Sequence, residues 1–212
     1  MKLLSDCRLY TFVDTAYLRG RAPDRIARQL CDGGSDLIQL RAKNSPVNEI
    51  RRLAELLLPI TQAASVRLVI NDHPTVAREV GADFCHLGQE DFFDAGHKYV
   101  GEIRGADSGL GIGLSTHAPA QAQRAVAAGA DYVAIGPVFA TGTKPTAKPV
   151  TLDYVRWAAE HVSIPWFAIG GINLETLDGV LAAGAQRVCV VSAILNTGDV
   201  GLTCREFRRR LN

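Results

Sequence analysis

The sequence lacks the features that would direct it to a membrane or a secretory route. No run approaches the roughly 18 apolar residues that a membrane helix needs, and the first ten residues contain no apolar core of a signal peptide. The formal net charge is only +1, so no general basic character predicts binding to nucleic acid or to an anionic membrane. We therefore expect a cytoplasmic protein with neither kind of partner, in which anion binding depends on local clusters.

Cysteine is scarce and unpatterned. There are five cysteines, an odd number, and no C-x-x-C spacing occurs. This predicts reduced thiols rather than a disulfide framework. Of the 212 residues, 47% are hydrophobic and 21% are charged, which is ordinary for a globular protein and is sufficient for a large core. We expect one domain over residues 1–212.

Eight short apolar runs are present, with helical patterns between them. The runs are nearly continuously apolar, which is typical of parallel strands buried on both faces. Alternation of eight strands with helices predicts an α/β fold, a single (β/α)8 TIM barrel. The runs cover residues 9–13, 37–40, 67–70, 84–87, 111–114, 132–135, 166–169 and 188–191, and the helical stretches cover 24–31, 47–63, 118–128, 152–161 and 174–182.

Four glycines support the barrel. Gly34, Gly81, Gly129 and Gly184 each follow a helical stretch and stand shortly before an apolar run. Glycine just past a helix can adopt the left-handed conformation that ends the last turn. The alternative is an open doubly wound sheet, which would usually place a G-x-G-x-x-G turn after the first strand. Residues 14–16 are Asp-Thr-Ala and contain no such motif.

Basic side chains follow the second and sixth runs. Barrel enzymes carry their sites at the C-terminal ends of the strands, and Arg41, Lys43 and Lys144 lie at such ends. This group suits a pyrophosphate, because Arg can bind two oxygens and Lys supplies a point charge. Gln39 shares the alternation with Arg41 and Lys43, so all three are expected on one side of the strand. The alternative is a solvated surface pair.

Two aspartates end neighbouring runs. Asp72 follows Asn71 after the third run, and Asp91 follows the fourth. Two carboxylates can hold Mg²⁺, which completes its shell with water and substrate phosphates. Without a cation their charges would repel each other. The alternative is that Asp91 only caps the following helix.

Glycines and a serine follow the last two runs. Gly170, Gly171, Val191 and Ser192 lie where barrels commonly bind a phosphate through backbone N–H groups. The alternative for the glycine pair is a tight turn that requires positive φ. With no nucleophile triad or redox motif apparent, this set predicts transfer between two phosphorylated substrates.

Two histidines and the C-terminal segment are ambiguous. His117 fits a general acid or base equally well as a residue at a helix N-terminus beside Pro119. His86 lies inside an apolar run and is interpreted as a core histidine. Residues 205–212, with three consecutive arginines, are interpreted as a solvated helix face.

The sequence closely resembles the thiamine phosphate synthase family over residues 9–195. The family's motifs are specific in combination, and each lies at a strand end already identified. They read QLRAK at 39–43, ND at 71–72, HLGQED at 86–91, GLSTH at 113–117, TGTK at 141–144, AIGGI at 168–172 and VSAI at 191–194. The chain departs from the family's pattern at His73 and Thr75, where Arg and Asp are frequent, and after Lys144, where a glycine is frequent.

The resemblance implies a reaction in which a thiazole phosphate displaces pyrophosphate from hydroxymethylpyrimidine pyrophosphate, giving thiamine phosphate. It implies Mg²⁺ as cofactor and two phosphorylated small molecules as partners, and a homodimer is left open. By analogy, the pyrimidine substrate is bound by Gln39, Arg41, Lys43, Asn71, Ser115 and Lys144, with Arg41, Lys43 and Lys144 as catalytic cations. Also by analogy, Mg²⁺ is bound by Asp72 and Asp91, and thiazole phosphate by Thr141, Thr143, Gly171, Val191 and Ser192.

Two other functions are open. A related thiazole tautomerase shares the barrel and uses a histidine, which Ser115, Thr116 and His117 also fit. Thr143, Lys144 and the two aspartates together favour the synthase. A catalytically silent sensor of thiamine precursors is the second alternative, and the complete set of charged site residues argues against it.

Overall fold

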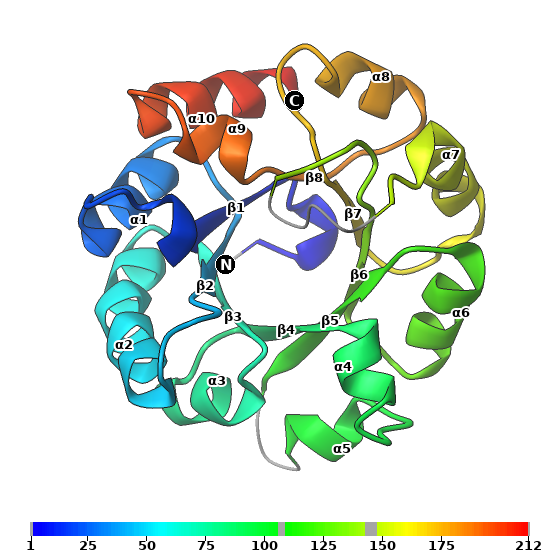
Figure 1. The fold of residues 1–212 in the computed structure, drawn as a ribbon, viewed down its shortest axis with the longest axis horizontal. Coiled ribbons are helices and arrows are strands. Elements are labelled where there is room, and N and C mark those ends of the chain that lie inside the picture. Colours follow the sequence, from blue (N-terminus) through cyan, green and yellow to red (C-terminus); the bar gives the residue numbers. More distant parts are fainter. Residues whose placement is uncertain (1, 106–108, 143–147, 212) are drawn as a thin grey trace.

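Eight parallel strands close into a barrel in the computed structural model, which describes residues 2–105, 109–142 and 148–211. Each strand pairs with its neighbours in sequence, and β8 pairs with β1 through Leu9 and Val188 (Figure 1). The predicted fold class is therefore confirmed. The strands are β1 (Leu9–Asp14), β2 (Leu37–Arg41), β3 (Arg67–Asn71), β4 (Phe84–Gly88), β5 (Gly111–Thr116), β6 (Tyr132–Ile135), β7 (Trp166–Ile169) and β8 (Val188–Cys189).

Helices surround the barrel on all sides (Figure 1). The predicted helix at 174–182 begins later, because Asn173 Oδ1 accepts the backbone N–H groups of Glu175 and Thr176 and so forms a turn first. None of the helices in the described ranges is long and apolar enough to cross a bilayer. The α-helices are α1 (Pro23–Asp32), α2 (Val47–Ala63), α3 (Pro74–Val80), α4 (Gln89–Phe93), α5 (Gly101–Arg104), α6 (Pro119–Ala127), α7 (Thr151–His161), α8 (Leu177–Ala182), α9 (Ser192–Leu195) and α10 (Val200–Arg210), and two 3-10 turns span Leu4–Asp6 and Thr15–Tyr17.

The four glycines adopt the predicted conformation. Gly34, Gly81, Gly129 and Gly184 have φ values of 86°, 73°, 82° and 99°. These values lie in the left-handed region, which residues that have a Cβ rarely adopt. Short loops therefore return the chain to the barrel, so that successive strands end at the same rim.

Aromatic rings fill the barrel interior. Tyr10, Tyr132 and Phe167 are fully or almost fully buried, and their rings meet edge to face at centroid distances of 5.4–6.0 Å. Cys85 and Cys189 are also buried, as expected for cysteines inside strands, and all five cysteines are free thiols. Large interior side chains leave room for ligands only at the ends of the barrel.

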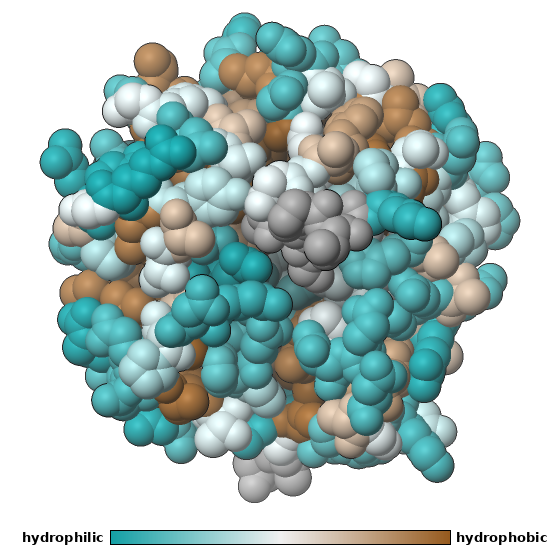
Figure 2. Space-filling view, viewed as in Figure 1, coloured by the Kyte–Doolittle hydropathy of each residue, from teal (hydrophilic) through white to brown (hydrophobic). Residues whose placement is uncertain are grey.

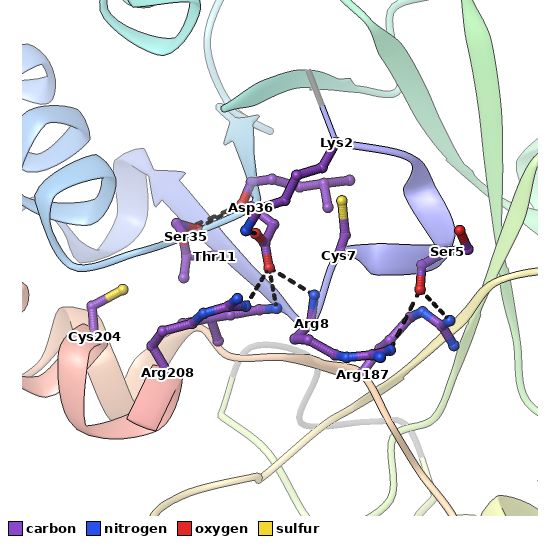
Figure 3. A network of polar contacts seen from close by, with 12 residues as sticks. Lys2, Ser5, Cys7, Arg8, Thr11, Ser35, Asp36, Arg187, Cys204 and Arg208 are labelled. Carbon is purple, nitrogen blue, oxygen red and sulfur yellow. Dashed lines mark hydrogen bonds and ion pairs between the residues drawn. The ribbon is translucent and has the colours of Figure 1, made fainter. Parts of the chain in front are cut away.

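The N-terminal end of the barrel is closed by a charged network centred on Asp36 (Figure 3). Asp36 accepts the backbone N–H groups of Arg8 and Leu9 and forms ion pairs with Lys2 and Arg208 at 2.7 and 2.8 Å. Burial alone would raise the pKa of Asp36, but these hydrogen bonds and positive charges hold it below its usual value. The carboxylate therefore stabilises the fold as an anion.

The C-terminal segment is not merely a solvated face, so that interpretation was wrong. Cys204 and Phe207 of α10 are completely buried, and Arg208 pairs with Asp36. The run of arginines obscured an amphipathic helix. Cys204 and Phe207 are three residues apart, so both side chains lie on the face of the helix that packs against the core.

Candidate active site

One cavity opens at the C-terminal ends of the strands. Its empty volume is about 990 Å³, including the part open to solvent, which is at the upper end for small-molecule sites. In Figure 2 hydrophilic side chains gather around the middle of the face over the barrel. All eleven site residues that were predicted and are described line this cavity: Gln39, Arg41, Lys43, Asn71, Asp72, Asp91, Ser115, Thr141, Gly171, Val191 and Ser192. Thr143 and Lys144 lie outside the described residues.

The basic side of the cavity is built at the end of β2. The Arg41 guanidinium donates to Asp14 Oδ2 at 2.8 Å, and the side chains are 13% and 1% exposed. Arg41 is therefore held in place and is not a solvated surface arginine. Lys43 is exposed, and within residues 2–105, 109–142 and 148–211 it forms neither a hydrogen bond nor an ion pair.

Asp14 is a functional candidate that the sequence reasoning missed. It lies directly beside Arg41 in the parallel register of β1 and β2, and it also accepts the backbone N–H of Ala16. An acidic residue ending one strand opposite an arginine ending the next was the available signal.

The acidic side of the cavity begins at the end of β3. Asn71 Nδ2 donates to Asp72 Oδ2 at 2.6 Å, and the Asp72 backbone N–H donates to the carbonyl of His86 at 2.9 Å. Asp72 has φ of 62°, a left-handed conformation that asparagine and aspartate tolerate better than most residues. This unusual backbone conformation turns the chain sharply at the cavity edge.

Burial and a like charge disturb Asp72. Burial raises its pKa, the nearby Asp91 charge raises it further, and Lys43 opposes the rise. Two carboxylates in one cavity repel in this way when no cation lies between them.

Asp91 is the third residue of α4, and the N-cap is Gly88, whose position carries no side-chain cap. The interpretation of Asp91 as an N-cap residue was therefore wrong. A Cβ at Gly88 would lie 2.5 Å from Asp91 Oδ2, so glycine leaves room for this carboxylate.

Among the described residues, Asp91 has no hydrogen bond and no ion pair, and no group of three or more His, Cys, Asp and Glu side chains converges. Two carboxylates with open surroundings fit Mg²⁺, which takes most of its ligands from water and substrate.

The opposite wall is formed by the loops after β6, β7 and β8. Gly170 and Gly171 have φ of 104° and 65°, and a Cβ at Gly171 would lie 2.7 Å from Phe139 Cβ. The glycine pair is thus both a tight turn and part of the cavity wall. Val191 and Ser192 stand at the start of the short helix α9, and Thr141 joins them from the loop after β6.

Both ambiguous histidines line the cavity. His117 Nδ1 lies within hydrogen-bonding distance of the Gly136 carbonyl, and its backbone N–H donates to Gln121 Oε1 at 2.6 Å. His86 is 8% exposed and hydrogen-bonds through both ring nitrogens, to Tyr132 and Ser115. It is a core histidine with its partners satisfied, as expected, but it also reaches the cavity.

Acidic, basic and glycine-rich elements at the C-terminal rim of a (β/α)8 barrel define an enzyme of the class that acts on phosphorylated small molecules. The chain matches the family model described as thiamine monophosphate synthase over residues 9–194, and it belongs to this family. It is 44% identical to thiamine-phosphate synthase of Thermus thermophilus over 89% of this chain and 88% of that relative. It is also 41% identical to the enzyme of Herpetosiphon aurantiacus over 95% of both chains.

Solved structures give the same result. The thiamine phosphate pyrophosphorylase from Pyrococcus furiosus superposes with a TM-score of 0.86 at 29% identity, covering 99% of this chain and 98% of that one. A 3-hexulose-6-phosphate synthase superposes with a TM-score of 0.64 at 18% identity, which shows a common fold alone. The curated relatives and the Pyrococcus furiosus structure carry names of thiamine phosphate-forming enzymes, and this chain is accordingly a transferase of thiamine biosynthesis.

Proposed function

We propose that this protein is a thiamine phosphate synthase. It condenses 4-amino-2-methyl-5-(diphosphooxymethyl)pyrimidine with thiazole phosphate and releases pyrophosphate. The observation that carries the proposal is that one cavity in a member of this family gathers basic, acidic and glycine-rich segments from separate strands. That combination suits two phosphorylated substrates and a divalent cation.

The chemistry is a substitution at the methylene carbon of the pyrimidine. The C–O bond to the diphosphate breaks and its electron pair leaves with the diphosphate, while the electron-rich aminopyrimidine stabilises the positive methylene. The lone pair of the thiazole nitrogen then forms the new C–N bond. Arg41 and Lys43 stabilise the charge that develops on the leaving group, and we assign the same role to Lys144 from the family resemblance. No nucleophile of the protein is required.

Asp72 and Asp91 are the residues that would hold Mg²⁺. The pKa of Asp72 is raised by burial and by Asp91, so a cation between the two would relieve an existing repulsion. When bound, Mg²⁺ neutralises negative charge on the diphosphate. Asn71 donates to Asp72 and so fixes the orientation of its carboxylate.

The wall formed by Thr141, Gly171, Val191 and Ser192 would bind the thiazole phosphate, and we assign the same role to Thr143 from the family resemblance. Glycine allows an anion to approach backbone N–H groups closely. This wall lies across the same cavity from Arg41 and Lys43. A phosphate bound there would hold the thiazole nitrogen near the methylene, and such positioning is a large part of catalysis between two substrates.

Product detection by mass spectrometry tests the proposal. Both substrates are mixed with purified protein, with and without Mg²⁺, and thiamine phosphate and pyrophosphate are expected only when all components are present. The absence of product with folded protein, together with calorimetric binding of both substrates, would indicate a silent sensor instead.

A thiazole tautomerase is the second candidate, because His117 lines the cavity and histidine is suited to proton transfer. Thiazole phosphate alone in deuterated water separates the two functions. Metal-independent proton exchange in this assay, together with no thiamine phosphate in the assay with both substrates, would favour the tautomerase and refute the synthase.

A further inference from the structure

A chain of hydrogen bonds crosses the barrel interior and links two sides of the cavity. Gln39 Nε2 donates to the Tyr10 hydroxyl at 2.5 Å, and the hydroxyls of Tyr10 and Tyr132 lie 3.0 Å apart. The Tyr132 hydroxyl lies 3.1 Å from His86 Nδ1, and His86 Nε2 lies 2.8 Å from Ser115 Oγ. We call these five residues the tyrosine–histidine chain. Its ends, Gln39 and Ser115, are residues assigned above to the pyrimidine substrate.

The barrel is built to admit this chain. Gly113 on β5 lies beside both His86 and Tyr132 in the strand register. A Cβ at Gly113 would lie 2.1 Å from Tyr132 Cζ and 2.5 Å from its hydroxyl oxygen. Only a residue without a side chain leaves the space through which Tyr132 reaches His86.

Both tyrosines keep their protons. Burial raises the pKa of Tyr10 and of Tyr132 well above the usual value. Each hydroxyl therefore has one proton to donate, and a buried donor without an acceptor is costly.

Donor and acceptor matching then gives the chain one direction. Among the described residues, the Tyr10 hydroxyl has only Gln39 and Tyr132 as hydrogen-bonding partners. It accepts from Gln39, so its proton is donated to Tyr132, and the proton of Tyr132 is donated to His86 Nδ1. Nδ1 consequently carries no proton, and a neutral imidazole then carries its proton on Nε2, which donates to Ser115 Oγ.

We propose that the tyrosine–histidine chain fixes the hydrogen-bonding polarity of the pyrimidine site, so that the amino form of the ring is selected over an oxo form. Ser115 accepts from His86 and therefore points its own proton to an acceptor of the ligand. Gln39 Nε2 donates to the Tyr10 hydroxyl, and this hydrogen bond selects one of the two possible orientations of the Gln39 side-chain amide. The proposal rests on the proposed function, and Tyr10, Tyr132 and His86 act as positioning residues.

The two ring forms differ in the way that such a site can detect. A 4-aminopyrimidine presents an amino donor beside a ring-nitrogen acceptor, whereas the 4-oxo analogue presents an acceptor beside an N–H donor. If the donors of the site are fixed, a donor of the protein faces the N–H donor of the 4-oxo ring. Polar mismatches of this kind discriminate strongly between ligands. A site with free rotors would adapt to both.

Tyr132→Phe removes the central hydroxyl and keeps the ring. Tyr154→Phe is the matched control, because Tyr154 is also buried and its hydroxyl lies 2.8 Å from both Thr116 Oγ1 and the Ala118 carbonyl, outside the chain. For Tyr132→Phe we expect KM for the pyrimidine diphosphate to rise about tenfold, the equivalent of one lost hydrogen bond. KM for thiazole phosphate should stay within about twofold.

Selectivity is measured as the Ki of the 4-oxo diphosphate analogue divided by the KM of the amino substrate. This ratio should fall about tenfold in Tyr132→Phe and should be unchanged in Tyr154→Phe. An unchanged ratio in Tyr132→Phe would overturn the proposal. So would an equal fall of the ratio in Tyr132→Phe and Tyr154→Phe that follows only the loss of melting temperature in each variant.

The tautomer of His86 provides a test that needs no turnover. Nitrogen-15 NMR of the free protein, with the His86 signals assigned by their loss in His86→Gln, should show a proton on Nε2 and none on Nδ1. In Tyr132→Phe the two tautomers should mix. A proton on Nδ1 in the unmodified protein would overturn the directed chain. If the unmodified protein forms no product, the proposed function and the selectivity argument fail together, while the tautomer still decides the direction of the chain.

Discussion

Asp36 and Asp72 occupy opposite ends of the same barrel and have opposite pKa shifts. Burial acts to raise the pKa of both carboxyl groups. At Asp36, hydrogen bonds from Arg8, Lys2 and Leu9 and the charge of Arg208 outweigh burial and lower the pKa (Figure 3). At Asp72, the charge of Asp91 adds to burial, and the pKa rises.

The difference separates a structural end from a functional end. Lys2, Arg208 and two backbone N–H groups satisfy Asp36 within the protein. At the other end, Asp72 meets a second carboxylate, and Lys43 and Asp91 have no hydrogen-bonding or ion-pair partner among the described residues. Charges that the fold leaves unbalanced are available for a ligand of balancing charge.

Asp72→Ala should give the largest effect. Removing half of the carboxylate pair is expected to lower kcat/KM by about 10³-fold, on the order of 4 kcal/mol, because charge on the leaving diphosphate is then poorly stabilised. The melting temperature should change little, because the repulsion that is removed offsets the lower tolerance of alanine for the left-handed backbone conformation at this position. Steady-state kinetics and thermal melts measure both, with Asp94→Ala, an exposed residue at the end of α4, as control. Full Mg²⁺-dependent turnover in Asp72→Ala would rule out the metal assignment.

Asp36→Ala should give the reverse result. It leaves Arg208 and two backbone N–H groups without their acceptor, and we expect a loss of about 3 kcal/mol in the free energy of unfolding. KM values should be unchanged in the protein that remains folded. Urea denaturation measures the loss. Asp153→Ala is the control, because it removes a surface ion pair in which the Asp153 side chain is 87% exposed. Its loss should be less than about 1 kcal/mol. Similar losses in the two variants would contradict a structural role for Asp36.

Asp14→Asn tests whether Asp14 positions Arg41 for the substrate. Asparagine keeps the shape but removes the charge that holds the Arg41 guanidinium at 2.8 Å. We expect KM for the pyrimidine diphosphate to rise about tenfold, with KM for thiazole phosphate nearly unchanged. Pyrophosphate inhibition should weaken to the same extent. An equal rise in both KM values would show a general loss of structure.

The pH dependence of the free energy of unfolding should distinguish Asp36 from Asp72. These are the smallest of the predicted effects. Asp36 has a lowered pKa, so its contribution is present above about pH 3.8, the usual value, and is lost as pH falls through its folded pKa. Asp72 has a raised pKa, so it destabilises the fold as pH rises from about 3.8 through its folded pKa. Asp72→Asn should therefore be slightly more stable than the parent at neutral pH and equal to it near pH 3. Urea denaturation across this range checks both signs, and a Asp72→Asn protein less stable than the parent at pH 7 would contradict them.

Much of this fold was predictable because its signals are local. Apolar runs identified all eight strands, and Gly34, Gly81, Gly129 and Gly184 identified the turns that return the chain to the barrel. Since parallel strands in a barrel end at one rim, residues just after each run had to meet, and those that the structure describes line one cavity.

The remainder depends on contacts between distant residues. Helices α3, α4, α5 and α9 have seven residues or fewer, which is too short for a clear helical period. Tyr10 and Tyr132 lie within apolar runs, where a polar group is easily interpreted as core, and Asp14 directly follows the first run. Their partners come from other strands, up to 122 residues away in sequence, and only the closed barrel reveals them.

The most direct test is a crystal structure of the protein with Mg²⁺ and pyrophosphate. We expect the cation between Asp72 and Asp91 and the diphosphate against Arg41 and Lys43. Diphosphate bound elsewhere, with the two carboxylates bound to neither ion nor ligand, would contradict it.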